Sequence, residues 1–279
     1  MTVVPQPGPR RSTSIWLFFV VAFDASWPFW SVAVFMGLSV EGPSGEVLFR
    51  VGLLGPLVAG ILFAWLGRSD GSWREYWMRL ADPRRIAARW YAVILLFMPA
   101  LMALAVLWDM AFETGTAFPL IGRRMAPFVA NPALIAPTLL NILLLGPLSE
   151  EFGWRGYALD RLQQRFTPAV SSLILGALWA LWQLPLFFIR DTFHHDDLGA
   201  WTPGFWVFVV QVIAMTFVMT WIFNHTRRST LGAILFRYMA SLAMFVANVS
   251  DETNFLATLL LLIAAVVICL RHRPAIRRT

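Results

Sequence analysis

The feature that most constrains this chain is a series of long apolar segments, each about as long as a helix that crosses a lipid bilayer. A bilayer core of about 30 Å requires roughly 20 helical residues that are mostly apolar. Only helices and closed barrels satisfy their backbone groups in lipid, and these segments lack the two-residue alternation of barrel strands. The sequence therefore predicts an all-α, polytopic membrane helix bundle with about eight transmembrane helices. The predicted spans are Ile15–Leu38, Val47–Leu66, Trp90–Leu107, Pro132–Ser149, Thr167–Ile189, Gly204–Asn224, Ser229–Val249 and Asn254–Leu270.

A single membrane domain is expected between two short tails. Residues 1–14 are polar and proline-rich, residues 15–270 hold the apolar segments without a long linker or a strong internal repeat, and residues 271–279 are basic. The first apolar segment is longer than the core of a signal peptide, so we expect a retained first span. The fourth span is expected to continue as helix through Glu150 to Arg165, because no helix breaker precedes Pro168.

The distribution of arginine predicts the orientation of the bundle. Every basic residue is arginine, and most fall in alternate connections if the N-terminus lies inside. Those inner segments are residues 10–11, 68–89, 155–165, 227–228 and 271–278. Because positive residues are enriched in cytoplasmic loops, both termini are predicted to be cytoplasmic. The exclusive use of arginine favours a bacterium with a GC-rich genome, and hence a bacterial plasma membrane.

Composition argues against several other classes of protein. Only 14% of the residues are charged, whereas soluble domains contain about 25%. The formal net charge of +6 does not indicate nucleic-acid binding, because the arginines cluster at the ends of apolar segments. The single cysteine, Cys269, allows no disulfide framework and no cysteine-based zinc site. The expected partners are the lipid bilayer and a membrane-associated peptide or protein, with no nucleic acid.

Two adjacent glutamates at the end of the fourth span are the strongest candidates for chemistry. Glu150 and Glu151 follow a charge-free apolar run, and Arg155 lies four residues after Glu151. Carboxylates at membrane depth are costly to desolvate, so they are usually functional or tightly paired. Residues four apart share one helix face, so Glu151 and Arg155 can pair.

The same spacing of four recurs in two other spans. It joins Trp179 to Gln183 in the fifth span and Arg237 to Ser241 in the seventh. Bundle packing can bring the polar residues of these three spans together. Trp179 alone is interpreted as ordinary core packing, and Gln183 either as a site residue or as a hydrogen bond between helices. Arg237 is expected to pair with a glutamate, with snorkelling to the membrane surface as the alternative.

With these motifs the sequence resembles the CAAX-type intramembrane proteases, also called the CPBP or Abi family. The family signature is Glu-Glu-x-x-x-Arg, then Phe-x-x-x-His, then His-x-x-x-Asn, in a helical membrane bundle. The first motif is intact as Glu150, Glu151 and Arg155. The surrounding sequence is also similar in Gly55–Gly60, in the arginine-rich segment before Arg89, in Trp182–Phe187 and in Asn224–Thr226.

The second and third motifs depart from the family pattern. Gln183 and Arg237 stand where the family has histidines, and Ser241 stands where it has asparagine. An amide can donate a hydrogen bond to an oxyanion but is a poor metal ligand, and an arginine neither binds metal nor gives up its proton. We therefore expect no cofactor and no metal at this site.

The resemblance implies an endopeptidase in which a glutamate at the Glu150 position activates water for attack on a peptide bond at the cytoplasmic side of the membrane. Glu151 and Arg155 would orient that glutamate, and Gln183, Arg237 and Ser241 would be altered oxyanion or positioning groups. The alternative is a degenerate relative that binds membrane peptides or lipid-linked partners without turnover, for example in bacteriocin immunity or maturation. Whether the chain is an enzyme is therefore left open by the sequence.

One further group of residues carries metal-like chemistry outside these motifs. The connection after the fifth span contains Asp191, His194, His195, Asp196 and Asp197. Short loops of this composition are mostly solvated, and this one is interpreted in that way.

Overall fold

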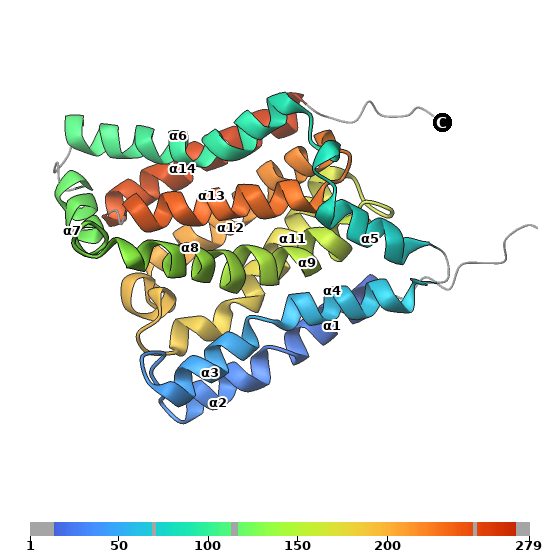
Figure 1. Cartoon of the computed structure of the whole chain (residues 1–279), viewed down its shortest axis with the longest axis horizontal. Helices are drawn as coiled ribbons and strands as arrows, with labels where there is room; N and C mark the ends of the chain where they lie inside the picture. The colour runs from blue at the N-terminus through green and yellow to red at the C-terminus, as the bar shows by residue number, and fades with distance from the viewer. Residues whose placement is uncertain (1–13, 69–70, 113–116, 248–249, 272–279) are drawn as a thin grey trace, which may run out of the picture.

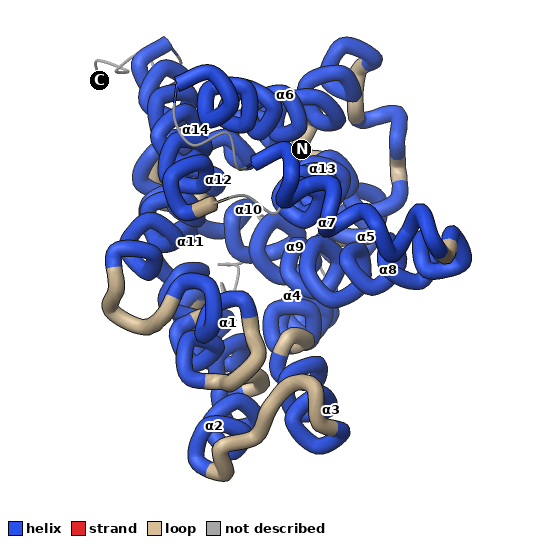
Figure 2. Tube along the Cα trace, turned by 90° about the vertical axis from the view of Figure 1, so that its left-hand side faces the viewer, coloured by secondary structure: helices blue, strands red, loops and turns tan. Residues whose placement is uncertain are grey.

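The computed structural model describes residues 14–68, 71–112, 117–247 and 250–271. Within these ranges, eight helical segments are long and apolar enough to cross a membrane. They are Ile15–Phe35, Pro43–Leu66, Ala88–Phe112, Pro132–Leu162, Pro168–Phe188, Pro203–His225, Thr230–Ala247 and Asp251–Arg271. The predicted all-α, polytopic membrane bundle is thereby confirmed, and the chain is an integral membrane protein (Figures 1 and 2).

The first two spans are each broken near their middle. The first consists of α1 (Ile15–Asp24) and α2 (Trp27–Phe35), and the second of α3 (Pro43–Gly52) and α4 (Gly55–Leu66). Each break comes just before a proline, Pro28 or Pro56, which cannot donate the backbone hydrogen bond that would continue the preceding helix. The first break is stabilised by a contact with the fifth span, because the indole of Trp182 donates a hydrogen bond to the Ser26 hydroxyl at 2.8 Å.

The fourth span is built from short helical pieces of different pitch. It runs through η3 (Pro132–Leu134), α8 (Ile135–Leu143), η4 (Leu144–Leu148), α9 (Ser149–Gly153), η5 (Trp154–Ala158) and α10 (Leu159–Leu162). The helix continues past Glu150, as expected, but ends at Leu162 rather than at Arg165. The elements η4 and η5 are π-helical turns on either side of the two glutamates. Single π-turns of this kind interrupt α-helices mostly at functional sites.

Two amphipathic helices lie outside the spans. They are α5 (Ser72–Ala81) and α7 (Ala117–Ala130), and neither was predicted from the sequence. In α5 the apolar side is formed by Trp73, Tyr76 and Leu80, which recur at the spacing of one helix face. The other elements are η2 (Pro83–Arg85), α6 (Ala88–Phe112), α11 (Pro168–Trp182), η6 (Leu184–Phe188), η7 (His194–Leu198), α12 (Pro203–His225), α13 (Thr230–Ala247) and α14 (Asp251–Arg271).

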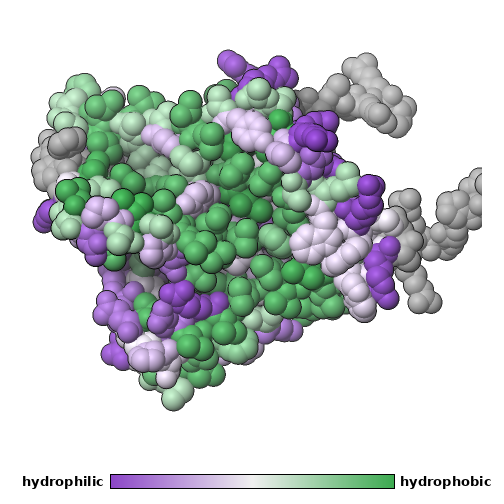
Figure 3. All heavy atoms as spheres, in the orientation of Figure 1, coloured by the Kyte–Doolittle hydropathy of each residue, from purple (hydrophilic) through white to green (hydrophobic). Residues whose placement is uncertain are grey.

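The site-bearing elements are packed in the middle of the bundle. Helix α11 packs on α12, α12 on α14, and α13 on α6, while α4 packs on both α1 and α9 (Figure 1). The core is rich in buried tryptophan, with Trp154, Trp179 and Trp182 almost fully enclosed. A broad apolar band crosses the face shown in Figure 3, with hydrophilic residues gathered toward its two ends. This distribution fits a bundle whose sides contact lipid.

The crossing of α4 with α9 is unusually close because it is made by glycines. A Cβ atom built on Gly153 would lie 2.3 Å from the carbonyl oxygen of Pro56. A Cβ built on Gly60 would lie 2.5 Å from the carbonyl oxygen of Phe152. Small residues allow such approach of helix backbones in membranes. The helix that carries both glutamates is thus fixed against α4.

Candidate active site

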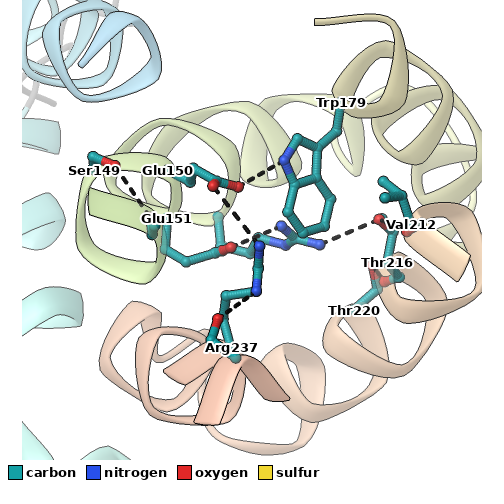
Figure 4. A network of polar contacts seen from close by, with 11 residues as sticks. Ser149, Glu150, Glu151, Trp179, Val212, Thr216, Thr220 and Arg237 are labelled. Atoms are coloured by element: carbon teal, nitrogen blue, oxygen red, sulfur yellow. Dashed lines mark hydrogen bonds and ion pairs between the residues drawn. The ribbon is translucent and has the colours of Figure 1, made fainter. Parts of the chain in front are cut away.

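The intact motif occupies α9 and the π-turn that follows it. Glu150, Glu151 and Arg155 are all buried, with exposed fractions of 4%, 0% and 0%. Three buried charged groups in one helical segment require compensation by hydrogen bonds or by each other. Their contacts come from α11, α12 and α13, which surround this segment (Figure 4).

Glu151 and Arg155 form a buried ion pair of their own. Arg155 Nη1 donates to Glu151 Oε1 at 3.0 Å, and its Nη2 donates to the Thr216 hydroxyl at 3.3 Å. Thr216 in turn donates to the carbonyl oxygen of Val212 at 2.8 Å, which anchors the pair on α12. The Arg155 guanidinium also lies over the Trp179 ring, 4.7 Å from its centroid. This pair joins the motif to α12.

Glu150 has a different set of partners. The indole nitrogen of Trp179 donates to Glu150 Oε2 at 2.7 Å, whereas Oε1 lies 3.8 Å from Arg237 Nη2. The second distance is an ion pair but is too long for a hydrogen bond. Gly146 lies one turn earlier, and a Cβ atom placed on it would be in van der Waals contact with Oε1, at 3.9 Å. One oxygen of Glu150 is therefore held by a hydrogen bond, and the other faces Arg237.

Trp179 does more than the core packing that the sequence suggested. Besides bonding Glu150, its ring lies beneath the guanidinium of Arg155 and 5.4 Å from that of Arg237. A tryptophan face attracts cations, so one side chain neutralises part of both charges. The interpretation as ordinary packing missed this role because the partners come from two other spans, the fourth and the seventh.

Arg237 and Ser241 lie together on α13. Arg237 Nη1 donates to the Ser241 hydroxyl at 2.6 Å, and Nη2 is directed at Glu150 (Figure 4). The Arg237 side chain is 17% exposed, so it is enclosed rather than extended to the membrane surface. The geometry favours pairing with Glu150 over the alternative of snorkelling.

Gln183 ends α11 on the same face as Trp179 but makes a contact that the sequence did not suggest. Its Oε1 lies 3.3 Å from Nε2 of His194, which belongs to η7. Its Nε2 is buried and has no hydrogen-bond partner among the described residues. The connecting loop thus divides into two parts: His195 faces solvent and contacts Asp196, whereas His194 faces the bundle.

The surroundings of His194 fix its ring and its charge. The ring meets Phe187 and Phe208 edge-on, with centroids 5.1 Å and 5.0 Å away. Removal from water, with a smaller contribution from the positive charge of Arg237, lowers the pKa of His194 to about 3. The imidazole is therefore neutral at physiological pH, and one nitrogen is a donor while the other is an acceptor.

Outside the membrane, α5 supports the motif from its C-terminal side. Arg79 donates to the carbonyl oxygen of Gly156, within η5, at 3.0 Å and pairs with Asp160 at 3.2 Å. Asp160 is shared with Arg228, in the turn between α12 and α13. Burial lowers the pKa of Arg79 to about 10, which still leaves it charged. The arginine-rich segment thus holds the π-turn that follows the two glutamates.

The residues around Glu150 do not fit a divalent cation. Its contacts are an indole N–H and a guanidinium, which are both donors and offer no lone pair to a metal. Within the described part of the chain, no three histidine, cysteine, aspartate or glutamate residues gather in a way that could hold a metal ion. The chemistry proposed for this site therefore uses only the side chains that surround Glu150.

Comparison with known proteins identifies a matching family and a similar protein. Residues 132–243, which contain every motif residue, match the family described as type II CAAX prenyl endopeptidase Rce1-like. The chain is also similar to the CAAX prenyl protease 2 of Methanococcus maripaludis, with 25% identity over 261 residues. That similarity covers 90% of this chain and 92% of the relative. Both comparisons support a CAAX-type protease family and, at the level of that family, an intramembrane endopeptidase. In this chain the second and third motifs are substituted.

Proposed function

We propose that the chain hydrolyses peptide bonds of membrane-associated peptides or proteins, with Glu150 as the general base. The observation that carries the proposal is the unequal state of the two Glu150 oxygens. Oε2 is fixed by Trp179, while Oε1 has no hydrogen bond to any residue that the structure describes and lies 3.8 Å from Arg237. A fixed carboxylate with one free oxygen is the geometry that a general base for water requires.

The reaction follows from the groups around that oxygen. Glu150 Oε1 takes a proton from a water molecule as the water oxygen bonds to the carbonyl carbon of the peptide. The negative charge that develops on the carbonyl oxygen is stabilised by Arg237 and by the free Nε2 hydrogens of Gln183. Glu150 then passes the proton to the amide nitrogen, the C–N bond breaks, and carboxylic acid and amine products leave. Glu151 and Arg155 position Glu150 and Trp179 without contacting the substrate.

The test is cleavage by the purified protein in detergent and in lipid nanodiscs. Because the similar proteins are named CAAX prenyl proteases, the substrate panel includes a prenylated-cysteine peptide and its unmodified form beside varied apolar peptides. We expect cleavage that Glu150→Gln abolishes and that Glu46→Gln, on the exposed end of α3, leaves intact. Removing Arg237 by Arg237→Gln is expected to lower kcat by about 100-fold, as for other oxyanion donors.

A second function is favoured by one specific observation. Both groups that contact Glu150 stabilise its ionised form, and both family histidines are replaced, by Gln183 and Arg237. The loss of both imidazoles from the site favours binding of membrane peptides without turnover. Absence of cleavage across the whole panel, together with measurable peptide binding that Arg237→Gln weakens, would select this function instead.

A further inference from the structure

The loop histidine His194 occupies a position that the motif residues do not explain. It lies outside the membrane-spanning segments, yet its Nε2 reaches the side chain of Gln183 at the end of α11. Gln183 stands one turn beyond Trp179, which contacts Glu150. His194 thus contacts the candidate site residue Gln183 directly, although the two residues belong to different elements.

The loop that carries His194 is held in place by its own hydrogen bonds. The Thr192 hydroxyl donates to the carbonyl oxygens of Leu186 and Ile189, each at 2.8 Å. The backbone N–H of His195 donates back to that hydroxyl at 3.2 Å. Together with the rings of Phe187 and Phe208, these bonds define where the imidazole points. The contact with Gln183 is therefore a built feature rather than a chance position of a mobile loop.

The contact has a consequence for the amide of Gln183. When Oε1 accepts from Nε2–H of His194, the amide cannot rotate freely, and its NH2 group is turned away from the imidazole. That NH2 group is buried and has no partner among the residues that the structure describes. A buried donor without a partner is destabilising, and a bound acceptor would remove that cost. A peptide carbonyl oxygen is an acceptor of the required kind.

We propose that His194 is a positioning residue, which holds the Gln183 amide with its NH2 group available to the carbonyl oxygen of a bound peptide. The proposal rests on the endopeptidase function proposed above and adds a residue to it from outside the three motifs. The imidazole acts through Gln183 and not on the substrate itself. Its position beside Gln183 places an imidazole near a motif position where the family histidine is missing.

The first experiment tests the geometry without any substrate. Protein labelled with ¹⁵N-histidine is studied by NMR in detergent, with the His194 signals assigned by their loss in His194→Phe. We expect a neutral ring with the proton on Nε2, and ¹⁵N shifts that change in Gln183→Leu. The matched control is His195→Phe, which should leave them unchanged. A proton on Nδ1, or shifts that ignore Gln183→Leu, would overturn the proposal.

The second experiment tests the role. His194→Phe keeps an aromatic ring between Phe187 and Phe208 but removes the donor, so kcat should fall by about 10- to 100-fold with little change in KM. His195→Phe should have no such effect. His194→Gln carries an amide far enough to reach Gln183 and should restore most of kcat, whereas the shorter His194→Asn should not. This pair of amides decides the question even if His194→Phe does not fold.

The outcomes separate this proposal from the proposed function. If His194→Phe loses no more activity than His195→Phe, or if His194→Asn restores kcat as well as His194→Gln, the positioning role is wrong and peptide hydrolysis stands. If the wild-type protein cleaves nothing, hydrolysis is wrong and peptide affinity replaces kcat as the readout. An approximately tenfold loss of affinity in His194→Phe, absent in His195→Phe, then supports the contact, and equal affinities overturn it.

Discussion

The two adjacent glutamates have separate duties in the structure. Glu151 forms an ion pair with Arg155. Arg155 also donates to Thr216 and so connects the motif to α12. Glu150 is held by Trp179 and faced by Arg237. Sequence spacing predicted the first pair, because both partners lie on one helix. It could not predict the indole donor, since that contact depends on how α9 packs against α11.

The pairing of Arg237 with Glu150 can be tested by a double-mutant cycle. Arg237→Leu leaves a buried carboxylate without its cation and should lower the free energy of unfolding by about 3 kcal/mol. Adding Glu150→Gln should recover part of that loss, because the uncompensated charge is removed. Glu151→Gln is the control, because Glu151 is already paired with Arg155 at 3.0 Å. Thermal unfolding in detergent measures all four combinations, and additive effects with Glu150→Gln would contradict the pairing.

The neutral state of His194 predicts a specific dependence of stability on pH. Its pKa is about 3 in the folded protein, against an ordinary value of 6.5 for histidine. Between these values the unfolded chain binds a proton that the folded chain does not, so stability is fully present above about pH 6.5 and falls as the pH drops toward 3. Each pH unit costs at most about 1.4 kcal/mol.

The measurement compares melting temperatures of wild type and His194→Phe between about pH 7 and pH 4.5. Carboxylates titrate in both proteins, so only the difference between the curves reports on His194. The wild-type curve should fall more steeply, and His195→Phe should follow it. If the melting temperatures of wild type and His194→Phe fall in parallel with pH, the His194 ring takes up a proton equally well in the folded and the unfolded protein, and the prediction is wrong.

At the scale of elements, the spans could be predicted because length and apolarity are local properties of the sequence. The helices α5 and α7 could not, since they are shorter than a membrane span, at 10 and 14 residues, and arginines interrupt their apolar sequence. The π-turns around Glu150 could not be predicted either, because the spacing of apolar residues in the sequence does not reveal them. The breaks after Asp24 and Gly52 depend on Pro28 and Pro56, which could equally have kinked continuous helices.

The crossing of α4 and α9 gives a prediction about elements. Gly153→Ala would put a methyl group 2.3 Å from the Pro56 carbonyl oxygen, so the helices must separate. We expect a loss of about 2–3 kcal/mol, and lower activity because Glu150 moves with α9. The control is Gly122→Ala in α7, where nothing lies within 4 Å of the added atom. That change should be neutral or stabilising by up to about 1 kcal/mol in thermal unfolding.

At the scale of the whole molecule, the orientation in the membrane is still a prediction from arginine placement. It is tested with single cysteines in a Cys269→Ser background, labelled on intact cells or sealed vesicles by an impermeant reagent. Arg74→Cys, in the predicted cytoplasmic connection, should be protected, and Glu41→Cys, between the first two spans, should be labelled. Both should react once detergent is added. Labelling of both positions from the same side would refute the eight-span arrangement.

The hydrogen bond between Ser26 and Trp182 has a consequence for the order of synthesis. Its two partners are separated by 156 positions, so the broken first span enters the membrane long before Trp182 has been made. During that interval the Ser26 hydroxyl is satisfied locally by the carbonyl oxygen of Ala22, at 3.0 Å. The candidate site is finished later still, because Arg237 and Ser241 belong to the seventh span. Under the proposed function, a nascent chain therefore acquires activity only after its seventh span has been made, which keeps the earlier spans inert toward neighbouring membrane peptides.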